Sequence, residues 1–325
     1  MSEPLLSVRG LTVVAGNERE SVPIVSDVDF DVAPGEVVGI VGETGSGKSM
    51  TMLSVMGLLP SPPMRVAAGE VRFRGTDLVR LADEEVRALR GAELAMVYQD
   101  PMSSLNPVMT IGDQVGEAMT AHGIGRDDAR RRTHEALARV GIPAPERTAR
   151  AYPHQFSGGM RQRAMIAMAL ALEPRLLIAD EPTTALDVTT QQQIVALVQD
   201  LRARTGMAIV WVTHDLSVIA RLAQRVIVMY AGRVVEHGPT RAIFRAPQHP
   251  YTAGLLAALP KPVGDERPEL AQIPGAPPDP AAIPPGCPFQ PRCRQAIDRC
   301  AAELPPLTRR GEGAAACWVP PAEWT

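Results

Sequence analysis

The sequence predicts an α/β fold in which helices cover both faces of a mainly parallel β-sheet. Three short apolar runs, at residues 37–41, 176–179 and 208–212, have the composition of buried strands. Helix-like segments separate these runs, which is the pattern of parallel strands joined by helical connections. At 325 residues, of which 45% are apolar, the chain can form a full core and still have room for an appendage.

The remaining elements follow from apolar periodicity and from the positions of proline and glycine. They are helices at 48–59, 157–172 and 189–204, strands at 70–73 and 94–97, and a helical insertion over about 101–150. The composition becomes rich in proline after about Leu259. We therefore expect a C-terminal extension that follows a boundary near Arg233–Arg241.

Charge and hydropathy argue against several classes of protein. The net charge of −3 gives no basis for binding nucleic acid or a membrane surface through bulk charge. No run approaches the roughly 20 apolar residues that a membrane span needs. The N-terminal Met1–Pro4 has neither the basic nor the apolar region of a signal peptide, so we expect a cytosolic chain whose cysteines form no structural disulfides.

The segment GETGSGKS at residues 42–49 has the pattern of a phosphate-binding loop between a strand and a helix. Its glycines let backbone N–H groups turn toward phosphate oxygens, and the helix N-terminus adds partial positive charge. Lys48 then reaches the outer phosphates, and the Ser49 hydroxyl ligates Mg²⁺. The predicted nucleotide-binding residues of this segment are Gly42, Glu43, Thr44, Gly45, Ser46, Gly47, Lys48, Ser49 and Met50.

Two acids, Asp180 and Glu181, end the apolar run that begins at Leu176. Acids at the carboxyl end of a strand face the ligand crevice of an open α/β sheet. Asp180 can then hold Mg²⁺, and Glu181 can polarise the attacking water of a hydrolysis. A helix N-cap followed by an acid in the first turn is the alternative for this pair.

Four further segments resemble motifs of the ABC-type ATPases, and they occur in the order of that family. They are Gln99 before Asp100-Pro101, the signature-like FSGGMRQR at 156–163, the D-loop-like 185–187 and the switch-histidine segment 213–215. The resemblance covers at least residues 5–240. It implies an ABC-type nucleotide-binding domain at 1–240 with an N-terminal antiparallel β subdomain, an inserted helical subdomain at about 101–160, and a small cysteine-containing extension at 241–325.

The resemblance also implies a catalytic group. Glu181 would activate water, His214 would hydrogen-bond the γ-phosphate, and Gln99 would sense Mg²⁺ and the attacking water. The implied Mg²⁺ ligands are Ser49, Gln99 and Asp180. The alternative for His214 is a histidine with its hydrogen bonds satisfied inside the core.

A second group of residues would act across a dimer. Ser157, Gly158 and Gly159 open a helix, so they form another anion site at a helix N-terminus. In the resembling family this site binds the ATP held by the partner subunit, and Asp187 would line the dimer interface. That family also has an aromatic residue that stacks on adenine. Spacing places Val13 at that position, with Val14 beside it, so we expect adenine to be held by apolar contact or by an aromatic residue from elsewhere.

Four segments, at 99–107, 157–169, 246–252 and 273–293, resemble the ATPase subunits of dipeptide and oligopeptide importers. The implied partners are a second, similar ATPase subunit in a heterodimer, two integral membrane permease subunits and an extracytoplasmic substrate-binding protein, without nucleic acid. The implied location is peripheral, on the cytoplasmic face of the membrane. Importers of nickel or glutathione remain alternatives, and a soluble ABC ATPase that acts on ribosomes or DNA is the competitor from another class. His249 is expected to cap the C-terminal helix, and a ligand or a catalytic base is the alternative for it.

All four cysteines lie near the C-terminus, at Cys287, Cys293, Cys300 and Cys317. No pair has the C-x-x-C spacing of a zinc ribbon, so the spacing does not favour structural zinc. Four thiolates can equally hold an iron–sulfur cluster. The resembling importer subunits carry a four-iron four-sulfur cluster in this tail, so we expect the cluster, with zinc and unligated thiols as alternatives.

Overall fold

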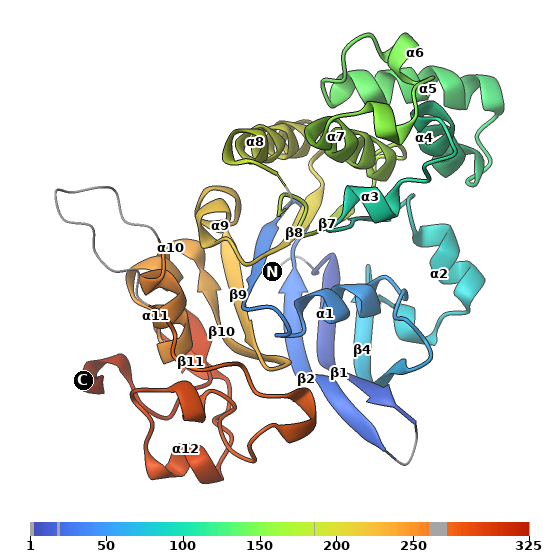
Figure 1. The fold of residues 1–325 in the computed structure, drawn as a ribbon. Helices are drawn as coiled ribbons and strands as arrows, with labels where there is room; N and C mark the ends of the chain where they lie inside the picture. Colours follow the sequence, from blue (N-terminus) through green and yellow to red (C-terminus); the bar gives the residue numbers. More distant parts are fainter. Residues whose placement is uncertain (1–2, 18–19, 185, 260–271, 325) are drawn as a thin grey trace, which may run out of the picture. The chain divides into compact units, whose positions relative to one another are not determined.

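The computed structural model describes residues 3–17, 20–184, 186–259 and 272–324 (Figure 1). Contacts within the chain divide it into two compact units. The first unit comprises Met1–Val32, Val37–Val79 and Val212–Thr325, and the second comprises Ala33–Glu36 and Arg80–Trp211. Among the described residues no helix is long and apolar enough to cross a membrane.

The first unit contains an antiparallel sheet formed mainly by the N-terminal strands. Its order is β2 (Ser21–Val32), β1 (Leu6–Gly16), β4 (Met64–Phe73) and β5 (Thr76–Asp77). Leu6, Val8 and Leu11 of β1 are 0% exposed, and a register shift between Val8 and Leu11 interrupts the alternation, so this strand contributes to the core on both sides of the shift. The expected N-terminal antiparallel subdomain is confirmed. The predicted strand at 70–73 is the end of β4, which begins six residues earlier.

A second sheet of the first unit joins the phosphate-loop strand to the C-terminal segment. Its order is β11 (Thr308–Arg310), β12 (Gly313–Ala315), β10 (Arg233–Pro239), β9 (Arg225–Tyr230) and β3 (Val37–Val41). β3 pairs with β9 in parallel, and the other neighbouring pairs are antiparallel. All five residues of β3 are buried, as predicted from its apolar composition. The extension thus adds two strands beside β10.

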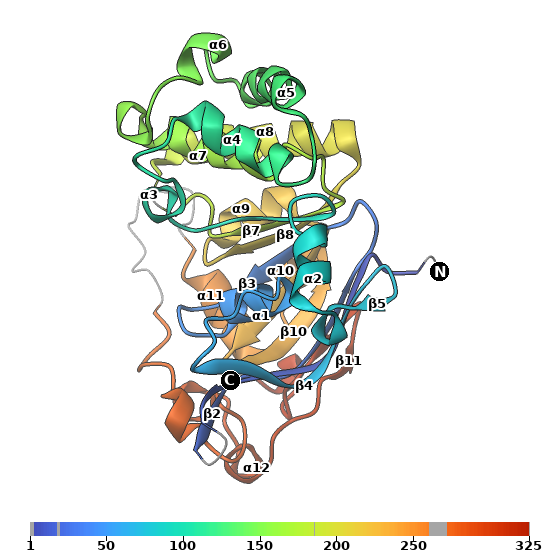
Figure 2. The same cartoon turned by 90° about the vertical axis from the view of Figure 1, so that its right-hand side faces the viewer.

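Short helices surround these sheets in the first unit (Figures 1 and 2). They are α1 (Lys48–Val55), α9 (Leu216–Leu222), α10 (Thr240–Arg245), α11 (Pro250–Ala257) and α12 (Asp298–Ala302), with single 3₁₀ turns at Pro280–Ala282, Gln290–Arg292 and Pro321–Glu323. Helix α1 is shorter than the predicted 48–59, because Gly57 turns the chain with a φ of 61°. The predicted division at residue 240 falls between β10 and α10, inside this unit, and stays a prediction.

The second unit combines three strands with a helical group. Its strands lie in the order β8 (Ala208–Thr213, of which all but the last two residues belong to this unit), β7 (Leu176–Asp180) and β6 (Leu94–Val97), and β6 and β7 are parallel. Its helices are α2 (Asp83–Leu89), α3 (Pro101–Ser104), α4 (Ile111–Thr120), α5 (Arg126–Arg139), α6 (Pro145–Thr148), α7 (Gly158–Ala169) and α8 (Val188–Thr205). Helices α4, α5 and α7 pack against one another. The helical insertion predicted over 101–150 is thus confirmed.

Candidate functional site

The loop at 42–49 connects β3 to α1, as its sequence predicts. The Lys48 side chain is 4% exposed, and its ammonium donates hydrogen bonds to the carbonyl oxygens of Gly42, at 2.8 Å, and Glu43, at 2.9 Å. Gly42 has a φ of 153°, and a Cβ there would lie 2.2 Å from the carbonyl oxygen of Met229. The loop therefore curves around a buried cation, and its binding of phosphate stays a prediction.

Glu43, the second residue of the loop, is held by groups from the C-terminal extension. Its backbone N–H donates to the Tyr251 hydroxyl at 2.8 Å. Its carboxylate accepts two hydrogen bonds from Arg292, of 2.6 and 3.0 Å. The hydrogen bond to Glu43 is the main reason that the pKa of Arg292 is raised. Neither Arg292 nor Tyr251 was predicted from the sequence, because both lie far along the chain and in no recognisable site motif.

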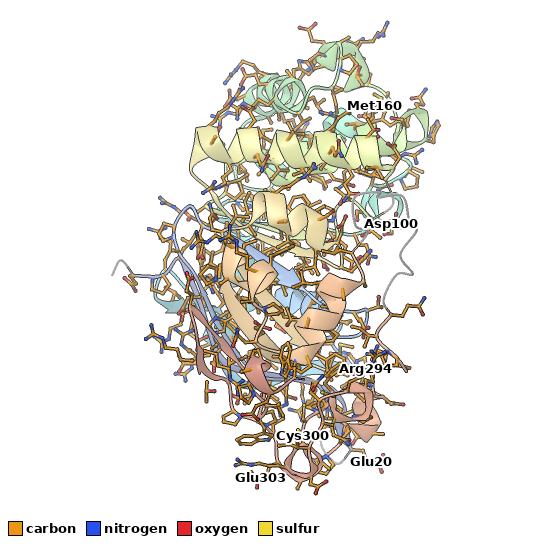
Figure 3. The ribbon with its side chains drawn as sticks, turned by 90° about the vertical axis from the view of Figure 1, so that its left-hand side faces the viewer. Glu20, Asp100, Met160, Arg294, Cys300 and Glu303 are labelled. Carbon is orange, nitrogen blue, oxygen red and sulfur yellow. The ribbon has the colours of Figure 1, made fainter. Side chains whose placement is uncertain are left out.

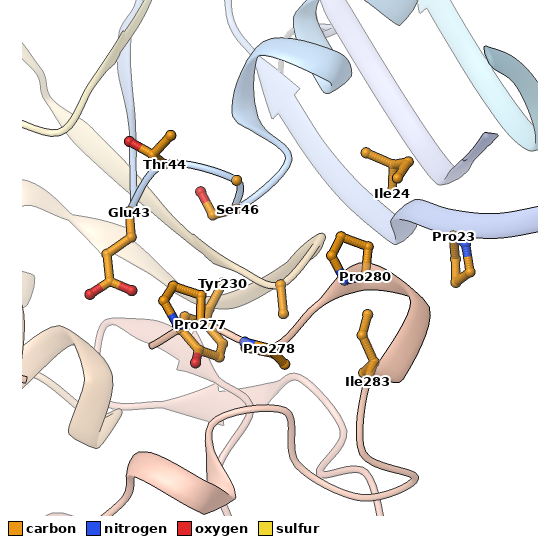
Figure 4. A pocket seen from close by; sticks show the side chains of 12 residues that line it. Pro23, Ile24, Glu43, Thr44, Ser46, Tyr230, Pro277, Pro278, Pro280 and Ile283 are labelled. Atoms are coloured by element: carbon orange, nitrogen blue, oxygen red, sulfur yellow. The ribbon is translucent and has the colours of Figure 1, made fainter. Parts of the chain in front are cut away.

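A small hollow beside the loop has a largely apolar wall (Figure 4). It is lined by Pro23, Ile24, Glu43, Thr44, Gly45, Ser46, Tyr230, Ala231, Pro277, Pro278, Pro280 and Ile283. Val13 does not belong to it. Val13 is 0% exposed within β1 and pairs with Val25 and Val66 in the antiparallel sheet, so the expectation that it occupies the adenine-contacting position is wrong.

Glu181 follows the last residue of β7 and has a φ of 46°, in the left-handed region. One of its carboxylate oxygens accepts hydrogen bonds from the Gln99 side-chain amide, at 3.3 Å, and from the Thr184 hydroxyl, at 2.9 Å. The structure thus brings the predicted residues Gln99 and Glu181 together, and it adds Thr184, which the sequence reasoning missed. The next helix begins only at Val188, which excludes the helix-cap alternative for Asp180 and Glu181.

The signature-like segment opens α7. The Ser157 hydroxyl accepts the backbone N–H of Met160 at 3.3 Å, so Ser157 is the N-cap, and Gly158 and Gly159 form the first turn. The predicted helix N-terminus is confirmed. A Cβ on Gly159 would lie 2.8 Å from the Thr190 side chain, so this turn lies directly against the start of α8.

Asp187 is the N-cap of α8. Its carboxylate accepts the Thr190 N–H at 2.9 Å and the Thr190 hydroxyl at 2.7 Å. The hydroxyl bond is the largest of the contacts that lower the pKa of Asp187. This position gives Asp187 a local structural role, and its place in a dimer interface stays a prediction. Ala185, the first residue of the predicted D-loop segment, lies outside the described residues.

His214 lies in the turn between β8 and α9, and its side chain is exposed. Asp215 caps α9 by accepting the Ser217 N–H at 2.9 Å. An exposed position at the end of a strand excludes the alternative of a core histidine. His214 belongs to the same unit as the phosphate loop, whereas Gln99 and Glu181 belong to the second unit.

The four cysteines are free thiols in the C-terminal extension. Burial raises the pKa of Cys287 and of Cys293 to about 11, and every pair among the four thiols interacts electrostatically. Even so, no group of three or more His, Cys, Asp or Glu side chains within the described ranges is arranged to hold a metal ion. Four thiols are nevertheless the donor set that an iron–sulfur cluster or a zinc ion needs, and the predicted cluster stays a prediction.

His249 caps α11, as the sequence predicts. Its Nδ1 accepts the Tyr251 backbone N–H at 3.1 Å, and the backbone N–H of His249 donates to the Glu236 carboxylate at 2.9 Å. The imidazole is fully buried, and this burial lowers its pKa to about 3. A neutral, buried cap is a structural group, so the alternative of a ligand or a catalytic base is not favoured.

Comparison with known proteins gives matches along the chain. A family described as ABC transporter matches residues 25–184, and one described as Oligopeptide/dipeptide transporter, C-terminal region matches residues 235–300. The dipeptide transport ATP-binding protein DppD of Escherichia coli (strain K12) is 51% identical over 310 residues, which cover 95% of this chain and 94% of DppD. The DppD protein of Bacillus subtilis (strain 168) is 47% identical over 319 residues, which cover 98% and 95%.

Solved structures show the same resemblance in three dimensions. The dimeric ATP-binding cassette MJ0796, in a post-hydrolysis state bound to ADP and Pi, superposes with a TM-score of 0.64 and 32% sequence identity. The match covers 73% of this chain and 99% of that chain. A structure of cbiO1 from Clostridium perfringens, part of the ABC transporter complex cbiONQ, has the same TM-score with 26% identity.

Proposed function

We propose that this chain, which belongs to the ABC transporter ATP-binding proteins with an oligopeptide/dipeptide transporter C-terminal region, powers the import of dipeptides or oligopeptides. ATP hydrolysis coupled to transport is the activity of this family. The substrate class is supported by one observation, which is 51% identity to a dipeptide transport ATP-binding protein across almost the whole chain. The match over residues 235–300 agrees with it.

The proposed mechanism gives each predicted site residue one role. Lys48 and the backbone N–H groups of its loop bind the β- and γ-phosphates of ATP. Glu181 accepts a proton from water as the water oxygen attacks the γ-phosphorus and the bond to ADP breaks. Gln99 and Thr184, which both donate hydrogen bonds to Glu181, hold that carboxylate in place. His214 donates a hydrogen bond to the γ-phosphate.

Mg²⁺ neutralises charge between the β- and γ-phosphates when it is bound. The oxygen atoms of Ser49, Gln99 and Asp180 would hold it, and such oxygen donors are the ligands that Mg²⁺ prefers. Asp180 ends β7 and is 6% exposed, which places its carboxylate at the carboxyl edge of the strands of its unit.

The signature residues act in a dimer in this proposal. The N-terminus of α7 at Ser157, Gly158 and Gly159 binds the γ-phosphate of the ATP held by a second ATPase subunit, and Asp187 lines the interface. The resemblance to a cassette solved as a dimer with ADP and Pi supports this arrangement. Two membrane permease subunits, an extracytoplasmic binding protein and a peripheral location at the cytoplasmic face of the membrane complete the proposed importer.

Replacing Glu181 by glutamine tests the hydrolysis mechanism. Loss of the base should lower the ATPase rate by about 10²–10⁴-fold and leave ATP binding intact, so that the ATP-bound dimer accumulates. The exposed Glu84, replaced by glutamine, is the matched control. A Glu181→Gln protein that hydrolyses ATP at the wild-type rate would show that another group activates the water.

Uptake by intact cells tests the substrate class. Disruption of the gene should abolish uptake of labelled dipeptide or short oligopeptide, and reintroduction of the wild-type chain should restore it. Uptake of labelled nickel and of labelled glutathione is measured in the same cells. Loss of either of these uptakes, with peptide uptake unchanged, would replace the peptide assignment by the corresponding alternative.

We also propose that Cys287, Cys293, Cys300 and Cys317 hold a four-iron four-sulfur cluster. Four soft thiolate donors favour this ligand class, and all four thiols are close enough to influence one another electrostatically. A cluster of four irons separates its thiolates more widely than a single ion does. Anaerobic purification with visible absorption and iron analysis tests the proposal, and a colourless protein with one zinc per chain would overturn it.

A further inference from the structure

Glu43 is an acid inside a loop that binds polyphosphate. An uncompensated carboxylate at this position would repel the ATP phosphates, because like charges at short range destabilise one another. Its side chain is 27% exposed, and its carboxylate lies against Arg292, whose side chain is 5% exposed. Figure 4 shows the Glu43 side chain extending from the loop toward the C-terminal segment. The charge of Glu43 is therefore neutralised on the side of the loop that faces this segment.

Contacts other than those with Glu43 also hold the Arg292 guanidinium in place. Its Nε donates to the carbonyl oxygen of Pro274 at 2.8 Å, and its Nη1 lies 3.3 Å from the Tyr230 hydroxyl. The guanidinium carbon lies 5.8 Å from the ring centre of Tyr230 and 5.9 Å from that of Phe289. Nη1 and Nη2 each donate to one carboxylate oxygen of Glu43 as a bidentate fork, which is the geometry that arginine offers to a carboxylate and lysine cannot.

The same segment also fixes the backbone of the loop. The Tyr251 hydroxyl accepts the Glu43 N–H, and the Tyr251 ring packs against Tyr230, with ring centres 4.6 Å apart, and against Phe289, at 5.4 Å. Tyr251 and Arg292 both belong to the C-terminal extension. One residue of the loop is thus held by two groups that approach it from separate parts of the extension.

We propose that Arg292 is a positioning residue for ATP binding, which acts through Glu43 to neutralise the phosphate loop and hold its shape. The inference rests on the proposed role of residues 42–49 as the nucleotide site. Arg292 lies between Cys287 and Cys293, so the folded cysteine segment determines where its guanidinium stands. The extension thereby contributes to nucleotide affinity.

Binding of a fluorescent ATP analogue, mant-ATP, to the full-length chain tests this proposal. Arg292→Met keeps the length of the side chain and removes the charge, so affinity should fall about tenfold or more, since one member of a charge pair is left alone. Arg292→Lys should give a smaller loss, because one point charge remains without the fork. Arg294→Met, at an exposed position of the same segment (Figure 3), is the matched control and should bind within about twofold of wild type.

A double-mutant cycle separates this role from a general effect on the fold of the extension. Glu43→Gln removes the charge that Arg292 neutralises, so adding Arg292→Met to it should cost less than about threefold in affinity. Thermal melting of each variant monitors folding. The same loss from Arg292→Met in both backgrounds, or wild-type affinity of the single variant, would overturn the proposal.

Steady-state hydrolysis provides a second readout. Arg292→Met should raise the KM for ATP and leave kcat within about twofold, because Arg292 acts on binding and touches no reacting atom. Lys48→Ala tests whether residues 42–49 form the nucleotide site. It should abolish mant-ATP binding in the wild-type chain and in each Arg292 and Glu43 variant. Wild-type binding by Lys48→Ala would refute the loop as the nucleotide site, and with it the role of Arg292. If Lys48→Ala abolishes mant-ATP binding while Arg292→Met leaves the KM for ATP unchanged, only the role of Arg292 is overturned.

Discussion

The buried imidazole of His249 makes the stability of the first unit depend on pH. His249 joins β10 to α11, because its backbone N–H donates to the Glu236 carboxylate and its imidazole Nδ1 accepts the Tyr251 N–H. Burial, followed by the nearby charge of Arg310, lowers its pKa from 6.5 to about 3. Below pH 6.5, His249 therefore binds a proton in the unfolded chain but stays neutral in the folded chain. The stability that this group contributes is complete above pH 6.5 and is lost as the pH falls toward 3.

The size of the effect follows from the two pKa values. Each pH unit between them costs about 1.4 kcal/mol, so a change from pH 7.5 to pH 5.5 should remove about 1.4 kcal/mol through His249 alone. This corresponds to a fall of about 3 °C in the melting temperature for a chain of this size class. His249→Asn keeps a side-chain oxygen that can cap α11 and removes the titrating group. The variant should be somewhat less stable at pH 7.5 and should lack the acid-dependent loss.

The assay is thermal or urea unfolding of the wild type and of His249→Asn at pH 7.5, 6.5 and 5.5. Glu236 shifts in the opposite sense, because burial raises its pKa and the folded chain gains stability as it takes up that proton. The difference between the two proteins at each pH cancels this contribution. His154→Asn, at an exposed position, is the control and should follow the wild type. Equal acid-dependent losses in His249→Asn and wild type would refute the reasoning.

Two further substitutions test the site itself. Gly42→Ala should abolish mant-ATP binding. The added Cβ would lie 2.2 Å from the Met229 carbonyl oxygen, and the φ of 153° is unfavourable for alanine, so the loop must change shape. Binding within a few-fold of wild type would show that the loop tolerates the change. Thr184→Val removes the hydroxyl that holds Glu181 and should lower kcat by about tenfold with little change in KM, whereas Thr184→Ser should retain the rate. An unchanged kcat in Thr184→Val would mean that Gln99 alone suffices to hold the carboxylate.

Local signals explain the parts of the fold that the sequence predicts well. The strand predicted at 37–41 coincides with β3, because an apolar, β-branched run lies between Pro34-Gly35 and Gly42. The start of α7 is likewise readable, since Ser157 offers a side-chain cap to a helix that follows at once. The meeting of Gln99 and Glu181 is less direct, and it follows from the parallel pairing of β6 and β7, whose carboxyl ends lie side by side.

Val13 shows why spacing from a motif is weaker evidence. A simple alternation along β1 would bury either Val13 or Val14. The pairing with β2 shifts register between Leu11 and Val13 and again between Val13 and Val14, so both valines are buried, at 0% and 7% exposed. A register shift cannot be predicted from amino-acid composition. The residues that lie beside the loop instead include Pro23 and Ile24 of β2.

The contact between Arg292 and Glu43 joins residues 249 positions apart, and no periodicity or local motif could predict it. The proline-rich composition after Leu259 suggests a separate appendage. In the structure, β12 extends the sheet next to β10, the 3₁₀ turn at Pro280–Ala282 packs on β2, and Tyr251 binds the loop backbone. Polar and edge contacts of this kind need little apolar sequence, so the composition does not reveal them. The predicted boundary near residue 240 lies inside the first unit, and the cation that neutralises the phosphate loop comes from the C-terminal side of it.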